Sequence, residues 1–219
     1  MFHDRTEAAL QLAEKLKGRQ LRNPLVLAIP RGGVVTGAVL ARELGADLDV
    51  VLARKLRAPD QPELAIGAVS EAGEVYLNHH ANEVLGVTEE YLAEEQRRQL
   101  AEIARRKELF RAVKPQEPIK GRSVLVTDDG IATGSTMIAA LQMVKAQNPY
   151  ESIVAVPVAS PDRLETVRHW CDDAVCLLEP KYFWAIGQFY EDFKQIEDEE
   201  VMEILRTFAQ AVPANPAIG

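Results

Sequence analysis

The sequence is poor in the features that mark several common classes of protein. It has only two cysteines among 219 residues, Cys171 and Cys176, with no His pair beside them, so neither a disulfide framework nor a zinc site is indicated. No apolar run approaches the roughly 20 residues that span a bilayer, and the N-terminus has no secretory hydrophobic region. These absences predict a cytoplasmic protein whose thiols lie in the core.

The chain also lacks an excess of positive charge. Its 25 Lys and Arg face 33 Asp and Glu, a net charge of −8, and its pI is near 5.1. Nucleic acids and anionic membranes are bound by basic surfaces, so we expect neither as a partner. With 47% hydrophobic residues the chain can bury one α/β core, and we expect a single domain over residues 1–219.

Two common nucleotide-binding signatures are missing as well. No Gly-x-Gly-x-x-Gly follows an apolar run, and no Gly-Lys-Ser/Thr occurs, so neither a dinucleotide site nor a P-loop is supported. A phospho-acceptor receiver domain has an Asp pair at its first strand, whereas the Asp pair of this chain comes after several predicted strands.

Residues 123–137 form the most informative stretch. A β-branched, apolar run predicts a buried strand, then come Asp128, Asp129 and a small hydroxyl-bearing loop, and residues 137–144 have the pattern of a helix. In an open α/β sheet such a loop lies at the carboxyl end of a strand, where the free N–H groups of a helix start point at a ligand. Carboxylates repel a bare anion but accept hydrogen bonds from hydroxyl groups, so the stretch suits a sugar phosphate.

An earlier stretch has the same order of strand, loop and helix. Residues 25–29 predict a buried strand, Pro30-Arg31-Gly32-Gly33 follows, and residues 34–44 predict a helix. Paired glycines let a backbone approach a ligand closely, and an Arg offers several donors to phosphate. A tight turn with a solvated Arg is the alternative.

The next predicted strand, Leu48 to Leu56, ends among three cations, Arg54, Lys55 and Arg57. They form either a phosphate clamp or an ordinary solvated strand end. Altogether, five parallel-type strands alternate with helices, which predicts an α/β doubly wound fold with a mostly parallel five-stranded sheet.

The run Val-Leu-Val-Thr-Asp-Asp-Gly-Ile-Ala-Thr-Gly-Ser-Thr-Met resembles the phosphoribosyl-pyrophosphate (PRPP) binding motif of the type I phosphoribosyltransferases, and Ala-Ile-Pro-Arg-Gly-Gly resembles their pyrophosphate loop. The resemblance implies Mg²⁺-dependent transfer of ribose 5-phosphate from PRPP to a nucleobase nitrogen, with release of pyrophosphate, in nucleotide salvage. A non-catalytic PRPP- or nucleotide-binding regulator and a phosphoribosyl hydrolase are the alternatives.

The same resemblance implies roles for individual residues. Asp128 and Asp129 would bind the ribose hydroxyls and, through these or through water, Mg²⁺. The pyrophosphate would be bound by Arg31, Gly32, Gly33 and Lys55, and the 5′-phosphate by Ala132, Thr133, Gly134, Ser135 and Thr136. Hypoxanthine-guanine enzymes have an Asp where this chain has Ala132, which argues against that acceptor class. Because such enzymes are commonly dimers, we expect a homodimer.

Two segments lie outside the predicted core. Residues 79–117 contain a long polar helix, from Thr88 to about Ala112, whose apolar residues are sparse; with the hairpin predicted before it, it could form a lid, a subunit contact or both. Residues 179–197 hold six of the chain's 13 aromatic residues and either plug the sheet edge or form a hood over the base, as in purine phosphoribosyltransferases. The hood interpretation makes Lys181, Tyr182, Phe183 and Trp184 candidate base contacts.

Overall fold

The structure is a computed structural model that describes residues 1–71, 73–77 and 86–210. Its elements, in chain order, are α1 (Arg5–Leu16), β1 (Leu25–Ala28), α2 (Gly32–Leu44), β2 (Asp47–Val50), β3 (Ala53–Ala58), β4 (Gln61–Ser70), β5 (Val75–Leu77), α3 (Glu89–Arg111), β6 (Ser123–Thr127), α4 (Ser135–Ala146), β7 (Glu151–Val158), α5 (Pro161–Arg168), β8 (Asp173–Leu178) and α6 (Asp198–Gln210).

The main sheet has five parallel strands in the order β2-β1-β6-β7-β8. The α/β doubly wound fold predicted from the sequence is therefore confirmed. β1 lies between β2 and β6, and Ala28 at its end pairs with Val50 on one side and with Thr127 on the other. This register places the loop after β1 directly beside the loop after β6.

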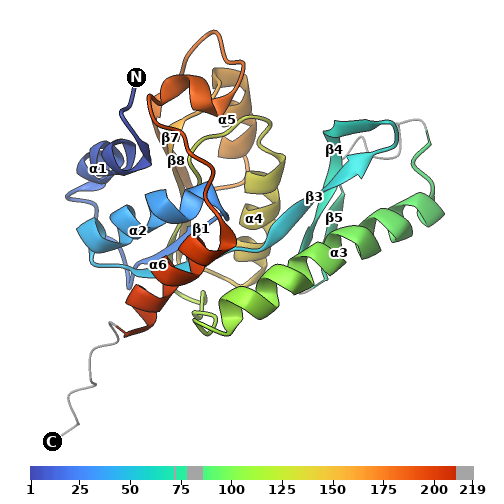
Figure 1. The fold of residues 1–219 in the computed structure, drawn as a ribbon, viewed down its shortest axis with the longest axis horizontal. Helices are drawn as coiled ribbons and strands as arrows, with labels where there is room; N and C mark the ends of the chain where they lie inside the picture. Colours follow the sequence, from blue (N-terminus) through green and yellow to red (C-terminus); the bar gives the residue numbers. More distant parts are fainter. Residues whose placement is uncertain (72, 78–85, 211–219) are drawn as a thin grey trace, which may run out of the picture.

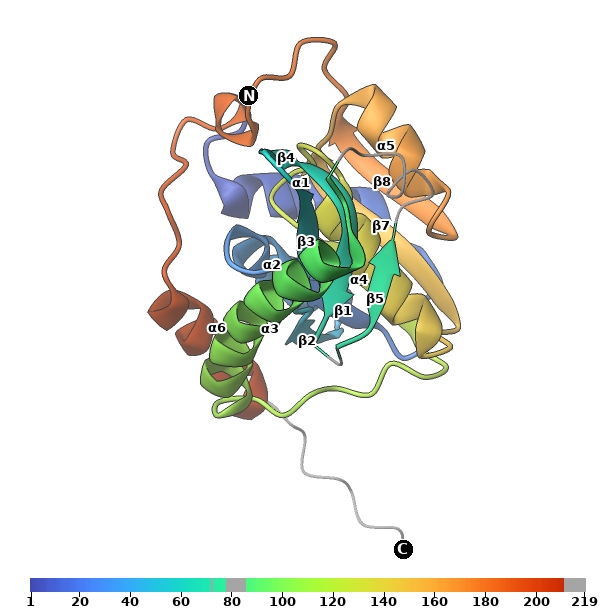
Figure 2. The same ribbon diagram turned by 90° about the vertical axis from the view of Figure 1, so that its right-hand side faces the viewer.

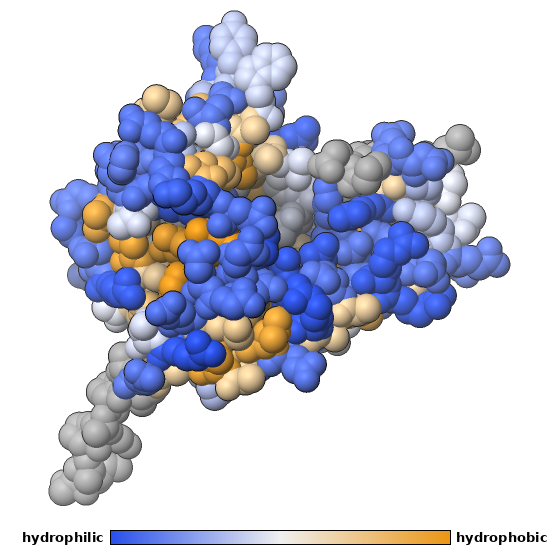
Figure 3. Space-filling view, viewed as in Figure 1, coloured by the Kyte–Doolittle hydropathy of each residue, from blue (hydrophilic) through white to orange (hydrophobic). Residues whose placement is uncertain are grey.

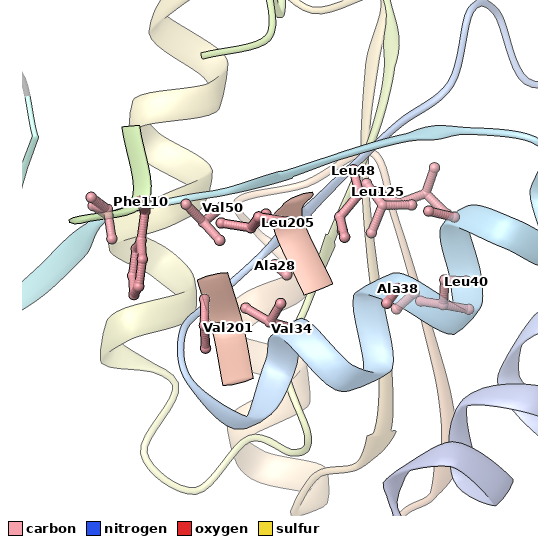
Figure 4. Packing of buried hydrophobic residues seen from close by; sticks show 14 of the residues in the cluster. Ala28, Val34, Ala38, Leu40, Leu48, Val50, Phe110, Leu125, Val201 and Leu205 are labelled. Carbon is pink, nitrogen blue, oxygen red and sulfur yellow. The ribbon is translucent and has the colours of Figure 1, made fainter. Parts of the chain in front are cut away.

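Helices cover both faces of this sheet (Figure 1). Alternate residues of each strand point to opposite faces, and so Val26 and Ala28 pack with α1, α2 and α6, whereas Leu25 and Leu27 pack with α4 and α5. Figure 4 shows the first of these two cores, where the labelled side chains come from the strands, α2, α3 and α6: Ala28, Val34, Ala38, Leu40, Leu48, Val50, Phe110, Leu125, Val201 and Leu205.

The prediction of one strand from Leu48 to Leu56 is wrong, because this segment contributes to two strands that belong to two different sheets. β2 ends at Val50 and is parallel to β1, whereas β3 begins at Ala53 and is antiparallel to β4. Val51 and Leu52, between them, are buried. The apolar run is continuous in sequence because the crossing between the sheets is itself inside the core.

The second sheet has the order β3-β4-β5 and is antiparallel. Together with α3 it forms an arm, defined here as residues 53–77 and 86–111 without residue 72, which projects from the main sheet (Figures 1 and 2). The predicted helix is confirmed almost to the residue, since Thr88 caps α3 by accepting a hydrogen bond from the Tyr91 N–H at 3.1 Å. Residues 79–85 of the predicted 79–117 insertion lie outside the described residues.

Residues 179–197 run from β8 to α6 and contain a short 3-10 helix at Ile186–Phe189. This segment, called the hood below, packs through Phe183, Phe189, Tyr190 and Phe193 against Phe2 and Ala8 near the N-terminus. In the described part of the chain, no helix has both the length and the apolar character needed to cross a bilayer.

Candidate active site

The loops after β1 and β6 touch each other through glycine backbone. A Cβ atom added to Gly32 would lie 2.0 Å from Oδ2 of Asp129, and one added to Gly33 would lie 2.9 Å from Cα of Asp128. Only glycine lets the backbone approach so closely, at Gly32 to the Asp129 carboxylate and at Gly33 to the Asp128 backbone. The two motifs singled out in the sequence therefore form a single site, in which Pro30 and Arg31 are joined by a cis peptide bond.

Asp129 is buried and its carboxylate is already paired. Arg5 of α1 donates from Nε to Oδ2 of Asp129 at 2.8 Å, and both side chains are about one-tenth exposed, 9% and 11%. The same guanidinium donates to the Lys194 carbonyl at 2.8 Å and lies 3.9 Å from the centre of the Phe193 ring. Tyr190 donates its hydroxyl to the Asp129 carbonyl at 2.6 Å. Helix α1 and the hood therefore hold Asp129 in one position.

Asp128 is in a different environment. Its Oδ1 accepts a hydrogen bond from the Asp129 N–H at 2.8 Å. Burial and the neighbouring Asp129 charge hold the pKa of Asp128 well above its usual range, because both effects disfavour the ionised form. The two adjacent acids are thus not equivalent: one is clamped as part of an ion pair, and the other favours the neutral form until a cation or an electron-poor group approaches it.

The loop after β6 ends in the first turn of α4. Gly134 has a left-handed backbone with φ of 81° and precedes the first helical residue, Ser135. The Ile138 N–H makes a helical bond to the Gly134 carbonyl at 2.9 Å, and N–H groups earlier in the turn have no acceptor inside the helix. This loop surrounds a cavity of about 160 Å³, called the loop cavity, which is lined by Asp128, residues 130–134, Thr136, Met137 and Ile186.

A second cavity, the arm cavity, lies between the edge of the main sheet and the arm. Its volume is about 240 Å³, and its walls include Pro30, Asp128 and Thr136 together with Arg54, Lys55 and Arg57 of β3 and Arg106 of α3. Figure 3 shows the surface hollowed between the body of the molecule and the arm. Three of these cations form the cluster predicted from the sequence. Arg106 is an addition to it, because the sequence gives no sign that α3 reaches this place.

The third cavity, the hood cavity, lies on the other side of the acid pair and has a volume of about 650 Å³. The polar residues Arg5, Arg31 and Asp129 line it together with Ala132, Trp184, Ile186 and Phe193. Arg31 donates to Glu197 at 2.7 Å, so the structure does not bring Arg31 into the same cavity as Lys55. Gly32 lines the hood cavity too, while Pro30 faces the arm cavity.

The four candidate base contacts are separated by the fold. Trp184 lines the hood cavity and is 87% exposed. Phe183 instead packs on Phe189, with ring centres 5.2 Å apart. Lys181 and Tyr182 are exposed and are not among the residues that line this cavity. Arg5 lines this cavity too and was not predicted to, because the amphipathic pattern of α1 gives no sign of a partner in the loop after β6.

The residues at the acid pair fit one kind of metal binding. Within residues 1–71, 73–77 and 86–210, no group of three His, Cys, Asp or Glu side chains is arranged to hold a metal ion. Mg²⁺ typically keeps water and takes one or two carboxylates together with substrate phosphate oxygens. Asp128, which borders both the arm cavity and the loop cavity, is placed to be such a carboxylate, so the site suits a magnesium ion that arrives with its substrate.

A five-stranded parallel sheet, an acid pair at the end of its central strand and a small hydroxyl-rich loop at the following helix start define the type I phosphoribosyltransferase fold class. The family assignment agrees: the phosphoribosyl transferase domain model matches residues 3–194, and the chain belongs to that family.

Relatives of this chain support the same assignment. Proteins from two strains of Mycobacterium tuberculosis, both provisionally named phosphoribosyl transferases, are 39% identical over 215 residues, which is 96% of this chain and 48% of the relative. The chain thus spans about half the length of these curated relatives. The crystal structure of TT1426 from Thermus thermophilus is 44% identical, covers 95% of this chain and 99% of that one, and superposes with a TM-score of 0.87.

Proposed function

We propose that this chain transfers ribose 5-phosphate from PRPP to a nitrogen of a nucleobase-like acceptor and releases pyrophosphate. One observation carries the proposal: three cavities meet at the acid pair. Asp128 borders both the arm cavity and the loop cavity, and Asp129 borders the hood cavity. A ribose between them could present its 5-phosphate, its diphosphate and its reacting carbon to three separate walls.

The donor fits the loop cavity by its hydrogen-bond donors and the arm cavity by its positive charge. The 5′-phosphate would lie in the loop cavity against the N–H groups and hydroxyls of residues 132–136. The diphosphate would lie in the arm cavity, where Arg54, Lys55 and Arg57 supply positive charge. The backbone of Gly32 and Gly33 would lie beside it, and Arg31 would reach it only by exchanging its ion pair with Glu197.

The acceptor fits the hood cavity. Trp184 offers an exposed ring on which a planar base can stack, and Ile186 and Phe193 supply further apolar wall. Ala132 also lines this cavity, so no acid from this loop position faces the acceptor, which argues against hypoxanthine or guanine. Lys181 and Tyr182 would contact an acceptor only if the hood closed over it.

The reaction breaks the bond between ribose C1 and a diphosphate oxygen and forms a bond between C1 and the acceptor nitrogen, which loses a proton. Positive charge develops on the ribose and negative charge on the diphosphate, so the site must stabilise both. Asp128 would hold the ribose hydroxyls beside the electron-poor ring, and the β3 cations would stabilise the leaving diphosphate. Bound Mg²⁺ would supply additional positive charge to the diphosphate oxygens. The arm would limit the access of water, which otherwise hydrolyses PRPP.

The test is pyrophosphate release from PRPP and Mg²⁺ in the presence of single bases from a panel, with a reaction lacking base as the control. Release that requires a base supports the transferase. Release without any base supports a phosphoribosyl hydrolase, and PRPP binding without release supports a regulatory module; either result contradicts the proposal.

Further proposals follow from family membership and from composition and charge rather than from the geometry. We infer that the chain acts in nucleotide salvage in the cytoplasm, as a homodimer and without a nucleic-acid or membrane partner. We also propose that residues 1–219 form one domain, in which residues 79–117 act as a lid over the donor and residues 179–197 as a hood over the acceptor.

A further inference from the structure

The long polar helix of the arm has an unexpected inward face. Its buried positions, Glu95, Gln99, Ile103 and Phe110, are four or seven residues apart and therefore share one face, and they include two polar side chains that are only 2% and 3% exposed. Arg106 falls on the same face by helical spacing and lines the arm cavity with Ile103. Buried polar side chains need hydrogen-bond partners, so Glu95 and Gln99, called the polar seam below, indicate that this face of α3 does more than cover apolar surface.

This polar seam holds the cations of β3 in place. The Gln99 amide donates to Glu95 Oε1 at 2.8 Å, and its oxygen accepts from Arg54 Nε at 2.7 Å. Glu95 Oε1 also accepts from the Arg57 N–H at 3.2 Å, while Tyr91 donates its hydroxyl to the Arg57 carbonyl at 2.9 Å. The helix therefore holds the side chain of Arg54 and the backbone of Arg57, two residues of the predicted phosphate clamp.

The arm cavity has more positive charge than its own carboxylates balance. Four cationic side chains line it against one carboxylate, Asp128. Burial, followed by the charge of Arg106, lowers the pKa of Arg54. Nε of Arg57 and Nε of Arg106 are buried and, among the described residues, have no hydrogen-bond partner. Arg106 Nε lies 3.3 Å from Glu102 Oε1, an ion pair without a hydrogen bond.

Buried guanidinium N–H groups are normally satisfied, and the ligand that suits several convergent arginines is a polyphosphate. We propose that Arg106 of α3 contacts the diphosphate of the donor, so that α3 is a wall of the donor site. This inference rests on the proposed function, because it assigns the diphosphate of PRPP to the arm cavity. Glu95 and Gln99 act as positioning residues for Arg54.

Calorimetric titration of the full chain with magnesium pyrophosphate, and separately with ribose 5-phosphate, tests the inference. In Arg106→Gln we expect pyrophosphate to bind about tenfold more weakly or worse, because a charge-assisted hydrogen bond is lost, and ribose 5-phosphate to bind as in the wild type. Arg97→Gln is the matched control: this Arg lies on the same helix, its side chain is 73% exposed, and it pairs with Glu94 at 2.7 Å. The control should bind both ligands unchanged.

A second variant gives an effect of opposite sign. Glu102→Gln removes the carboxylate that forms an ion pair with Arg106 and should tighten pyrophosphate binding several-fold, a result that loss of folding cannot imitate. If the wild type, Arg106→Gln and Glu102→Gln all bind pyrophosphate with equal affinity, the inference is overturned. If the wild type nevertheless binds PRPP, the proposed function still stands. If Arg106→Gln weakens the binding of pyrophosphate and of ribose 5-phosphate equally, Arg106 has a structural role and the inference is overturned as well. If the wild type binds neither PRPP nor pyrophosphate, the proposed function itself fails.

Discussion

At the scale of single residues, the site shows how environment separates two chemically identical neighbours. Asp129 is clamped by Arg5 and by the Tyr190 hydroxyl on its carbonyl, so its charge is balanced before any substrate arrives. Asp128 instead accepts a hydrogen bond from a backbone N–H and borders two cavities. We therefore expect the carboxylate of Asp128, rather than that of Asp129, to bind the ribose hydroxyls.

Replacing Asp128 should abolish turnover and stabilise the fold. Folding raises the pKa of Asp128, so this group stabilises the protein below its unfolded pKa of about 3.9 and loses that contribution as the pH rises through the folded pKa. At neutral pH its ionised form costs stability, and Asp128→Asn removes the charge. We expect no pyrophosphate release and a free energy of unfolding at pH 7 higher by on the order of 1 kcal/mol.

Urea unfolding of the wild type and of Asp128→Asn, from pH 8 down to pH 4, checks the direction of this effect. The extra stability of the variant should shrink as Asp128 of the wild type becomes protonated. Glu165→Gln, an exposed acid on α5, should change neither turnover nor this pH dependence. Wild-type turnover in Asp128→Asn would remove Asp128 from the site, and a less stable variant at pH 7 would contradict the direction of the pKa shift.

At the scale of elements, α3 is attached to the body at its C-terminal end. Phe110 is fully buried in the core that contains Val50, Leu205 and α2 (Figure 4). Arg111 next to it donates to Asp49 of β2 at 2.6 Å and to Glu71 of the arm at 3.1 Å. Burial raises the pKa of Asp49 despite the Arg111 charge. The end of α3 thus joins the arm to the main sheet.

We predict that Phe110→Ala destabilises the chain by about 3–5 kcal/mol, because it removes a large side chain and leaves a cavity. The same change should weaken pyrophosphate binding, since α3 would no longer hold Arg106 and Gln99 against the arm cavity. Chemical unfolding and calorimetry measure the two effects. Lys107→Ala, at an exposed position of the same helix, should stay within about 0.5 kcal/mol of the wild type; a similar loss in both variants would argue against a specific role for Phe110.

At the scale of the whole molecule, the strand order decides where chemistry is possible. β1 and β6 are neighbours in the sheet although almost a hundred residues separate them in sequence, and the arm and hood lie on opposite sides of their carboxyl ends. One ligand can therefore reach both loops. The net charge of −8 repels an anionic donor at long range, which leaves the arm cavity as the local source of attraction.

Association of two chains is the prediction that belongs to this scale. β5, at the edge of the arm sheet, exposes Val75 and Leu77 by 38% and 42%, and an exposed apolar edge strand favours pairing with another chain. Sedimentation equilibrium should give about twice the 24.2 kDa chain mass. A single-chain mass at micromolar concentration would contradict the dimer, and Val75→Lys, if it lowers the mass, would place the contact on this edge.

The sequence by itself determined the fold class, the family and the two loops that meet at the site. These are local signals: buried strands read as apolar runs, and Gly32, Gly33 and Gly134 mark backbone that only small residues can form. The first residues of two helices are likewise set by local caps: the Asp4 side chain accepts from the Glu7 N–H at 2.8 Å at the start of α1, and Thr88 caps α3.

Only the tertiary structure decided which distant side chains share a cavity. It paired Arg5 with Asp129 across 124 residues, turned Arg31 toward Glu197 rather than toward Lys55, split the run from Leu48 to Leu56 between two sheets, and brought Arg106 to the arm cavity. None of these has a local pattern, because each depends on how elements pack and not on their own periodicity. The division between Asp128 and Asp129 arises in the same way, since burial and partners, not residue type, set the charge of a carboxylate.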